Sequence, residues 1–178
     1  MLILIIKKII NIPISKEVKY FYKMQKIIFK NQHIDKGLFK QQQNYFLKPV
    51  DNNDEKSTLI NHCKLWIWLG NYFMNNPKQN LNKQIKRQFF NNFQVPFKKH
   101  GCYLCDYLNS NCEKCLSWNY LFNSLSECIC MDSYYGILVY ETSLTKRQKI
   151  LLCYQIAFLA LNTEHNITLK DILKNYNN

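Results

Sequence analysis

Two Cys-x-x-Cys pairs are the residues of this chain best suited to chemistry. The pairs are Cys102/Cys105 and Cys112/Cys115, and six residues separate them. Each pair places two sulfur atoms on one side of a tight turn, and two pairs can close a tetrahedral shell around one zinc ion. The spacing therefore predicts Zn²⁺ bound by these four thiolates, with buried free thiols or disulfides as the alternative.

Three further side chains could enter the same ligand shell. Cys128 and Cys130 follow the pairs, and His100 precedes Cys102. The gap between the pairs is shorter than the 15–20 residues, roughly, of a zinc ribbon, so we expect a compact knuckle inside a loop-rich insertion at about 100–130. Closed zinc shells stabilise a fold and seldom catalyse a reaction.

The remaining cysteines and histidines give no second site. Cys63 and Cys153 fall on apolar helical stripes, which is typical of core residues. His33, His62 and His165 have no spacing that assigns them to the metal. The sequence also lacks a glycine-rich phosphate loop and the His-x-Glu and Pro-Cys-x-x-Cys motifs of nucleobase deaminases. We therefore expect a binding protein and not an enzyme.

The net charge of +12 is unevenly distributed along the chain. Residues 1–50 carry +8, residues 51–100 carry +5 and residues 101–178 carry −1. A basic segment can follow a phosphate backbone, although AT-rich coding would also raise the lysine content. The candidate nucleic-acid contacts beyond the N-terminal arm are Lys83, Lys86, Arg87, Lys98 and Lys99.

Apolar residues at three- and four-residue intervals predict helices in the middle of the chain and near its end. The expected spans are 57–77 with Ser57 or Thr58 as the cap, 80–93, 145–161 after a Thr145–Gln148 capping box, and a short helix from 168. Residues 137–140 could instead form a short strand.

A polar stretch at 48–57 indicates a linker. We therefore expect a basic N-terminal arm and linker over 1–56 and a helical domain over 57–178. The predicted fold class is predominantly α, a small helical domain with a compact four-cysteine zinc knuckle in a loop-rich segment.

The N-terminus does not resemble a secretory signal. The apolar run at 1–6 has no basic region ahead of it and no small-residue cleavage site, and it is too short to span a bilayer. We expect no membrane span and an intracellular, reducing compartment, which favours bound metal over disulfides. Because residues 1–40 are basic and poor in acid, an organelle is the alternative compartment.

Several short motifs share their order with one group of known proteins. They are Leu65-Trp66-Ile67-Trp68-Leu69, Pro77, Cys102-x-x-Cys105-Asp106-Tyr107, Cys112-x-x-Cys115-Leu116-x-Trp118, Cys128, Ser133-x-Tyr135, Lys146-Arg147-Gln148 and Gln155-Ile156-Ala157. Over about 59–161 this order resembles small cysteine-rich, zinc-binding proteins of unknown function encoded by bacteriophages and prophages. Members often have proline after the fourth cysteine, where this chain has Leu116.

The resemblance implies either of two functions. The first is a nucleic-acid-associated accessory protein of a mobile element or phage, acting on DNA or RNA in the host cytoplasm. The second is a protein–protein interaction with a host complex, namely inhibition of a defence machine such as a nucleic-acid-guided nuclease. Since Trp66 and Trp68 cannot face the same side of one helix, one of them could be exposed for such a partner. The skewed composition also allows a structural subunit of a large organellar assembly.

Overall fold

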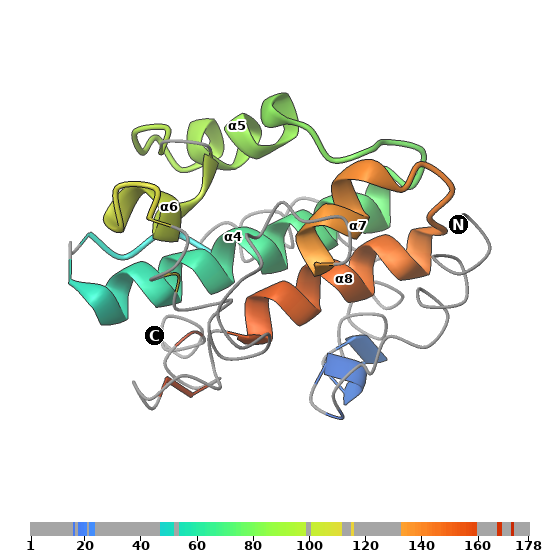
Figure 1. Cartoon of the computed structure of the whole chain (residues 1–178), viewed down its shortest axis with the longest axis horizontal. Helices are drawn as coiled ribbons and strands as arrows, with labels where there is room; N and C mark the ends of the chain where they lie inside the picture. Colours follow the sequence, from blue (N-terminus) through green and yellow to red (C-terminus); the bar gives the residue numbers. More distant parts are fainter. Residues whose placement is uncertain are drawn as a thin grey trace, which may run out of the picture.

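The computed structural model describes residues 16, 18–20, 22, 23, 47–51, 54–98, 101–111, 115, 133–159, 167, 168 and 172. The helices are α4 (Glu55–Asn75), α5 (Lys83–Asn92), α6 (Tyr103–Tyr107), α7 (Tyr134–Tyr140) and α8 (Lys146–Leu159) (Figure 1). Within these residues there is no strand, so the predicted α class is confirmed. The alternative of a strand at 137–140 is wrong, because α7 covers these residues.

Polar caps determine where the main helices begin. The Asp54 carboxylate accepts a hydrogen bond from the Ser57 backbone N–H at 2.7 Å, so α4 begins at Glu55 and not at the predicted cap, Ser57 or Thr58. The Asn82 side chain caps α5 in the same way.

The predicted capping box of α8 is confirmed. The Gln148 side chain accepts from the Thr145 backbone N–H at 2.8 Å, and the Gln148 N–H donates to Thr145 Oγ1 at 3.3 Å. Two helix donors are thus satisfied reciprocally at the point where α8 begins.

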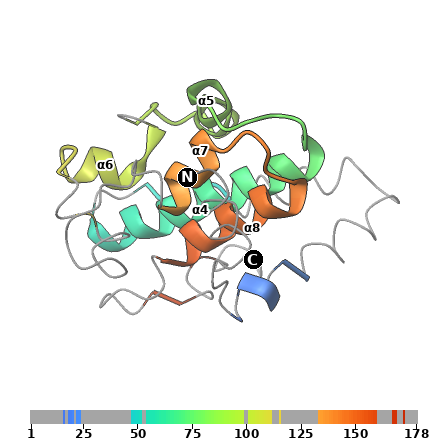
Figure 2. The ribbon, with the colours of Figure 1, turned by 45° about the vertical axis from the view of Figure 1, so that its right-hand side comes forward.

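Helix α8 runs antiparallel along α4 and forms the centre of the core with it (Figures 1 and 2). The pairing direction follows from contacts along both helices. Near the end of α8, the Ala157 carbonyl accepts from the Cys63 thiol at 3.1 Å, and near its start the Lys149 amine donates to the carbonyls of Pro77 and Gln79. Every side chain from 149 to 159 is buried, so α8 is covered on all sides after its first turn.

Gly70 of α4 lies in close contact with Tyr154 of α8. The Tyr154 ring lies directly on the Gly70 backbone, where an added Cβ would be 2.8 Å from Tyr154 Cδ1. The Tyr154 hydroxyl, also buried, donates to the Asn71 side chain at 2.6 Å. Glycine is therefore required at position 70 because any side chain would occupy the space of the ring.

Parts of the predicted N-terminal arm pack on α4. Val18 and Leu47 belong to the buried core, and the Lys64 amine donates to the Lys48 carbonyl at 2.7 Å. Burial lowers the pKa of Lys64 to about 8. The boundary at residue 56 stays a prediction.

In the part of the chain that the structure describes, no helix combines the length and apolarity needed to cross a membrane.

We predict that Gly70→Ala lowers the free energy of unfolding by about 1–3 kcal/mol, because the new methyl group overpacks the Tyr154 contact. Alanine is otherwise the better helix former by about 0.8–1.0 kcal/mol, so a net loss must come from this clash. Urea unfolding measures the effect. In a Tyr154→Leu background the same change should be neutral or stabilising; equal losses in both backgrounds would contradict the packing argument.

Candidate metal and nucleic-acid sites

The first Cys-x-x-Cys pair lies at the start of the single-turn helix α6, close to α4. Gly101 precedes it with a φ of +63°, a left-handed conformation that favours glycine. Its missing side chain also leaves room for neighbours, since an added Cβ would lie 3.0 Å from Lys86 Cδ and 3.2 Å from Phe97 Cζ. Cys102 is then the N-cap of α6, but its side chain makes no capping hydrogen bond. Its thiol is therefore available for other contacts.

The Cys102 thiol lies between a second thiol and an imidazole. Its sulfur is 3.8 Å from Nδ1 of His62, which is buried on α4, and it shares a side-chain hydrogen bond with Cys105. His62 was not among the ligands predicted from the sequence. It lies forty positions before Cys102, so no spacing rule could have found it; only the packing of α6 on α4 brings the two residues together.

The environment of Cys102 disfavours its thiolate. The hydrogen bond with Cys105 and burial raise the pKa of Cys102 to about 12, against a smaller lowering by His62. Reactive cysteines of redox pairs and proteases have lowered pKa values. In this arrangement Cys102 is therefore a hydrogen-bonded thiol and not an activated nucleophile.

The four-cysteine shell itself stays a prediction. Among the described residues, no three His, Cys, Asp or Glu side chains form a ready-made metal-binding group. Cys115 is described and buried. The other candidate ligands lie outside the described residues, and they are Cys112, Cys128, Cys130 and His100.

The two cysteines expected in the core are confirmed there. Cys63 and Cys153 are both fully buried, in α4 and α8 respectively. Burial raises the pKa of the Cys63 thiol to about 12 and raises that of Cys153 as well. Neither is placed as a reactive thiol.

Two of the basic candidates are exposed together on α5. Lys83 and Arg87 are one turn apart, and both lie against the ring of Phe97, with Lys83 Nζ 5.8 Å and Arg87 Cζ 5.1 Å from its centroid. Cation–π contacts of this kind restrain long side chains at the surface. Lys99 lies outside the described residues.

Lys86 occupies a different environment from its neighbours. It is only 4% exposed, and its amine donates to the Tyr135 hydroxyl at 3.0 Å. The same amine lies 4.4 Å from the centroid of the Tyr135 ring and 5.5 Å from that of Trp66. The aromatic rings replace water around the cation, and this burial removes Lys86 from the surface that could contact nucleic acid.

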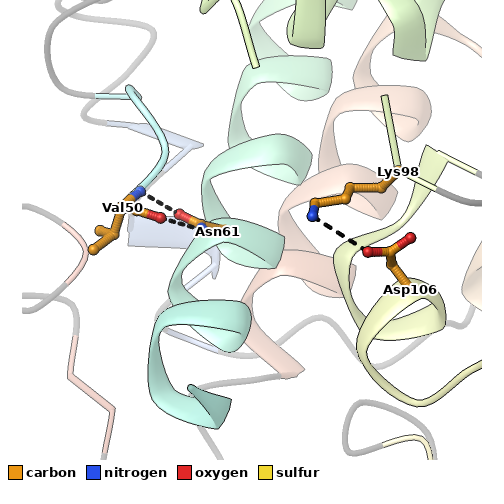
Figure 3. A network of polar contacts seen from close by, with 4 residues as sticks. All are labelled: Val50, Asn61, Lys98 and Asp106. Atoms are coloured by element: carbon orange, nitrogen blue, oxygen red, sulfur yellow. Dashed lines mark hydrogen bonds and ion pairs between the residues drawn. The ribbon is translucent and has the colours of Figure 1, made fainter. Parts of the chain in front are cut away.

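Lys98 borders a pocket of about 710 Å³ between the first half of α4, residues 93–98 and α6. Its amine forms an ion pair with Asp106 at 3.2 Å (Figure 3). On the α4 side, the Asn61 amide pairs with both backbone groups of Val50, at 2.6 and 2.9 Å (Figure 3). The pocket lining also includes Lys48 and Asp51, so charges of both signs face it.

Neither Trp66 nor Trp68 is fully exposed as an anchor for a partner protein. Trp66 is 3% exposed and packs edge-on against Tyr135. Trp68 is half-buried and stacks on Tyr72. The large aromatic residues that the structure describes as exposed are Tyr20, Tyr107 and Tyr140.

Comparisons of this chain with protein-family models, with curated proteins and with solved structures find no match.

We predict that amine acetylation of the folded protein modifies Lys83 at least about tenfold faster than Lys86. Burial between rings protects Lys86, and a tenfold difference needs only about 1.4 kcal/mol of local opening free energy. Peptide mass spectrometry after brief labelling gives the two rates from one sample. Equal rates in folded protein would mean that Lys86 is not enclosed; equal rates after unfolding are the expected control.

Proposed function

We propose that this protein is a non-catalytic, zinc-stabilised binding protein that holds the phosphate backbone of a nucleic acid along the exposed face of α5. One observation carries the proposal. The exposed side of α5 presents Lys83 and Arg87, and the sequence contains no aspartate or glutamate from residue 56 to residue 105. Cationic side chains gathered on one exposed helix face attract phosphates.

The buried face of α5 is largely apolar and its exposed face is polar, as a helix that contacts nucleic acid requires. Its buried face holds the helix to the protein through Ile85, Phe89 and Phe90. Its exposed side chains are all basic or amide, and they are Lys83, Gln84, Arg87, Gln88, Asn91 and Asn92. Amide side chains both donate and accept hydrogen bonds, so they suit phosphates and base edges alike.

The pocket beside α6 is less suited to phosphate. Its two cations, Lys48 and Lys98, are balanced by two carboxylates, Asp51 and Asp106, and Lys98 is already paired with Asp106. A phosphate entering it would meet two carboxylates. We therefore assign nucleic-acid contact to α5 and not to the pocket.

The zinc part of the proposal is supported by the first cysteine pair. Cys102 and Cys105 are three positions apart at the start of α6, which is the Cys-x-x-Cys spacing typical of zinc sites. A metal at this point would stabilise a segment with little regular structure of its own.

Inhibition of a host protein complex is the weaker alternative. It would need exposed aromatic anchors, and the described residues offer exposed tyrosines, Tyr20, Tyr107 and Tyr140, but no exposed tryptophan, since Trp66 is buried and Trp68 is packed against Tyr72. Origin in a phage or mobile element is proposed on the motif resemblance alone.

We predict that the double variant Lys83→Ala/Arg87→Ala binds DNA or RNA more weakly and with a smaller salt dependence. Each lost phosphate contact reduces the slope of log K against log salt by about 0.9 for duplex DNA or about 0.7 for single strands, so removing two should reduce it by about 1.8 or 1.4. Fluorescence anisotropy with labelled oligonucleotides at several salt concentrations gives these slopes.

The matched control is Lys146→Ala/Arg147→Ala, which removes the same charge from exposed positions at the start of α8. It should lower affinity only slightly, with a slope close to that of the unmodified protein. Equal effects of the two double variants would show that net charge, and not the α5 face, determines binding. Absence of salt-sensitive binding in the unmodified protein would reject the nucleic-acid function.

A further inference from the structure

We infer that α5 is a recognition helix for duplex DNA, in which Gln84 and Asn91 read adenine edges in the major groove while Lys83 and Arg87 hold phosphates beside it. The inference rests on the proposed function and adds to it the form of the nucleic acid and the base that is read. Adenine presents an acceptor, N7, and a donor, N6, in the major groove, and one Asn or Gln amide can pair with both.

The cations and the amides occupy different parts of the exposed face of α5. Successive residues turn by about 100° around a helix, so the exposed Lys83 and Arg87 lie together at one edge of this face. Gln84 and Asn91 lie near its middle, on the same side of the helix, because seven residues make about two turns. A helix in a groove meets base edges with the middle of its exposed face and phosphates with its edges.

Phe97 holds both cations at that edge. Lys83 Nζ lies 5.8 Å and Arg87 Cζ 5.1 Å from the centroid of the Phe97 ring. Phe97 packs in turn on the buried Phe90, which follows Lys83 by about two turns and so lies on the same side of α5. The cations are therefore drawn towards Phe97 and leave the middle of the face to the amides.

The amides in the middle of the face are available to a ligand. Other asparagine side chains make hydrogen bonds inside the protein, since Asn71 accepts from the Tyr154 hydroxyl and Asn82 caps α5. In the described part of the chain, by contrast, no hydrogen bond engages the side chains of Gln84 and Asn91. Each amide can therefore offer both its donor and its acceptor to one base.

The exposed face of α5 favours duplex DNA over other nucleic acids. Proteins that bind single strands stack the bases on aromatic rings, whereas every exposed side chain of α5 is basic or amide. The major groove of an RNA helix is too deep and narrow for side chains to read. B-form DNA has a major groove about 12 Å wide, which admits an α-helix. Figures 1 and 2 show α5 on the outer side of the described helices, where a duplex could reach it.

The test measures binding of the full-length protein to DNA duplexes of equal length, one with only A·T pairs and one with only G·C pairs, by fluorescence anisotropy. We expect the A·T duplex to bind at least about tenfold more tightly, because a bidentate contact between an amide and adenine discriminates by roughly this factor. A third duplex carries 7-deazaadenine, which lacks the N7 acceptor but keeps base pairing and the minor groove. It should lose most of the preference; affinity equal to that of the A·T duplex would overturn the inference.

The variant Gln84→Ala/Asn91→Ala should lose the preference for A·T pairs and keep the salt dependence of binding, because the phosphate contacts of Lys83 and Arg87 remain. Alanine is a better helix former than either replaced residue, so the variant should fold. The control is Gln79→Ala, which removes an exposed amide from the segment before α5. It should bind each duplex as the unmodified protein does.

Three results would overturn the inference and leave the proposed function standing. They are salt-sensitive binding without a preference for A·T pairs, a preference that survives in Gln84→Ala/Asn91→Ala, and tighter binding to single strands or RNA duplexes than to the A·T duplex. Absence of salt-sensitive binding to any of these nucleic acids would reject both the inference and the nucleic-acid function.

Discussion

The antiparallel contact between α4 and α8 is the constraint on which the rest of the structure depends. The Tyr154 ring can lie on α4 only because position 70 has no side chain. Its hydroxyl then donates a hydrogen bond to the Asn71 side chain inside the core. At the other end, the Lys149 amine satisfies carbonyls of the chain that leaves α4. Register and spacing of the two helices are thus determined by a few specific contacts along a mostly apolar interface.

Helix α4 packs against other helices on two of its sides. It packs on α8, while α5 and α6 lie on its side away from α8 in both views (Figures 1 and 2). That second side carries His62 towards Cys102, and Trp66 towards the enclosed Lys86 amine. Because α4 is held in place by the core, the positions of the cysteine pair and of α5 both depend on it. The two proposed activities, metal binding and nucleic-acid contact, therefore both depend on the position of α4.

Much of the helical layout could be predicted from local signals. The Thr145–Gln148 capping box correctly predicted α8, and the regular spacing of apolar residues in 80–93 correctly predicted α5. Both signals depend only on residues within one or two helical turns. Tertiary contacts could not be predicted in this way. The burial of Lys86 depends on rings contributed by α4 and α7, and the meeting of His62 with Cys102 depends on how α6 packs.

Hydrogen exchange of the zinc-loaded and chelated protein, followed by mass spectrometry, tests the central claim that α4 and α8 are held together by their own contacts, whereas the proposed zinc stabilises the cysteine segment. The account predicts slow exchange in α4 and α8 in both samples. Residues 102–111 should be protected only when zinc is bound. Chelation that leaves exchange in 102–111 unchanged, or that releases α4 and α8 together with it, would contradict the account.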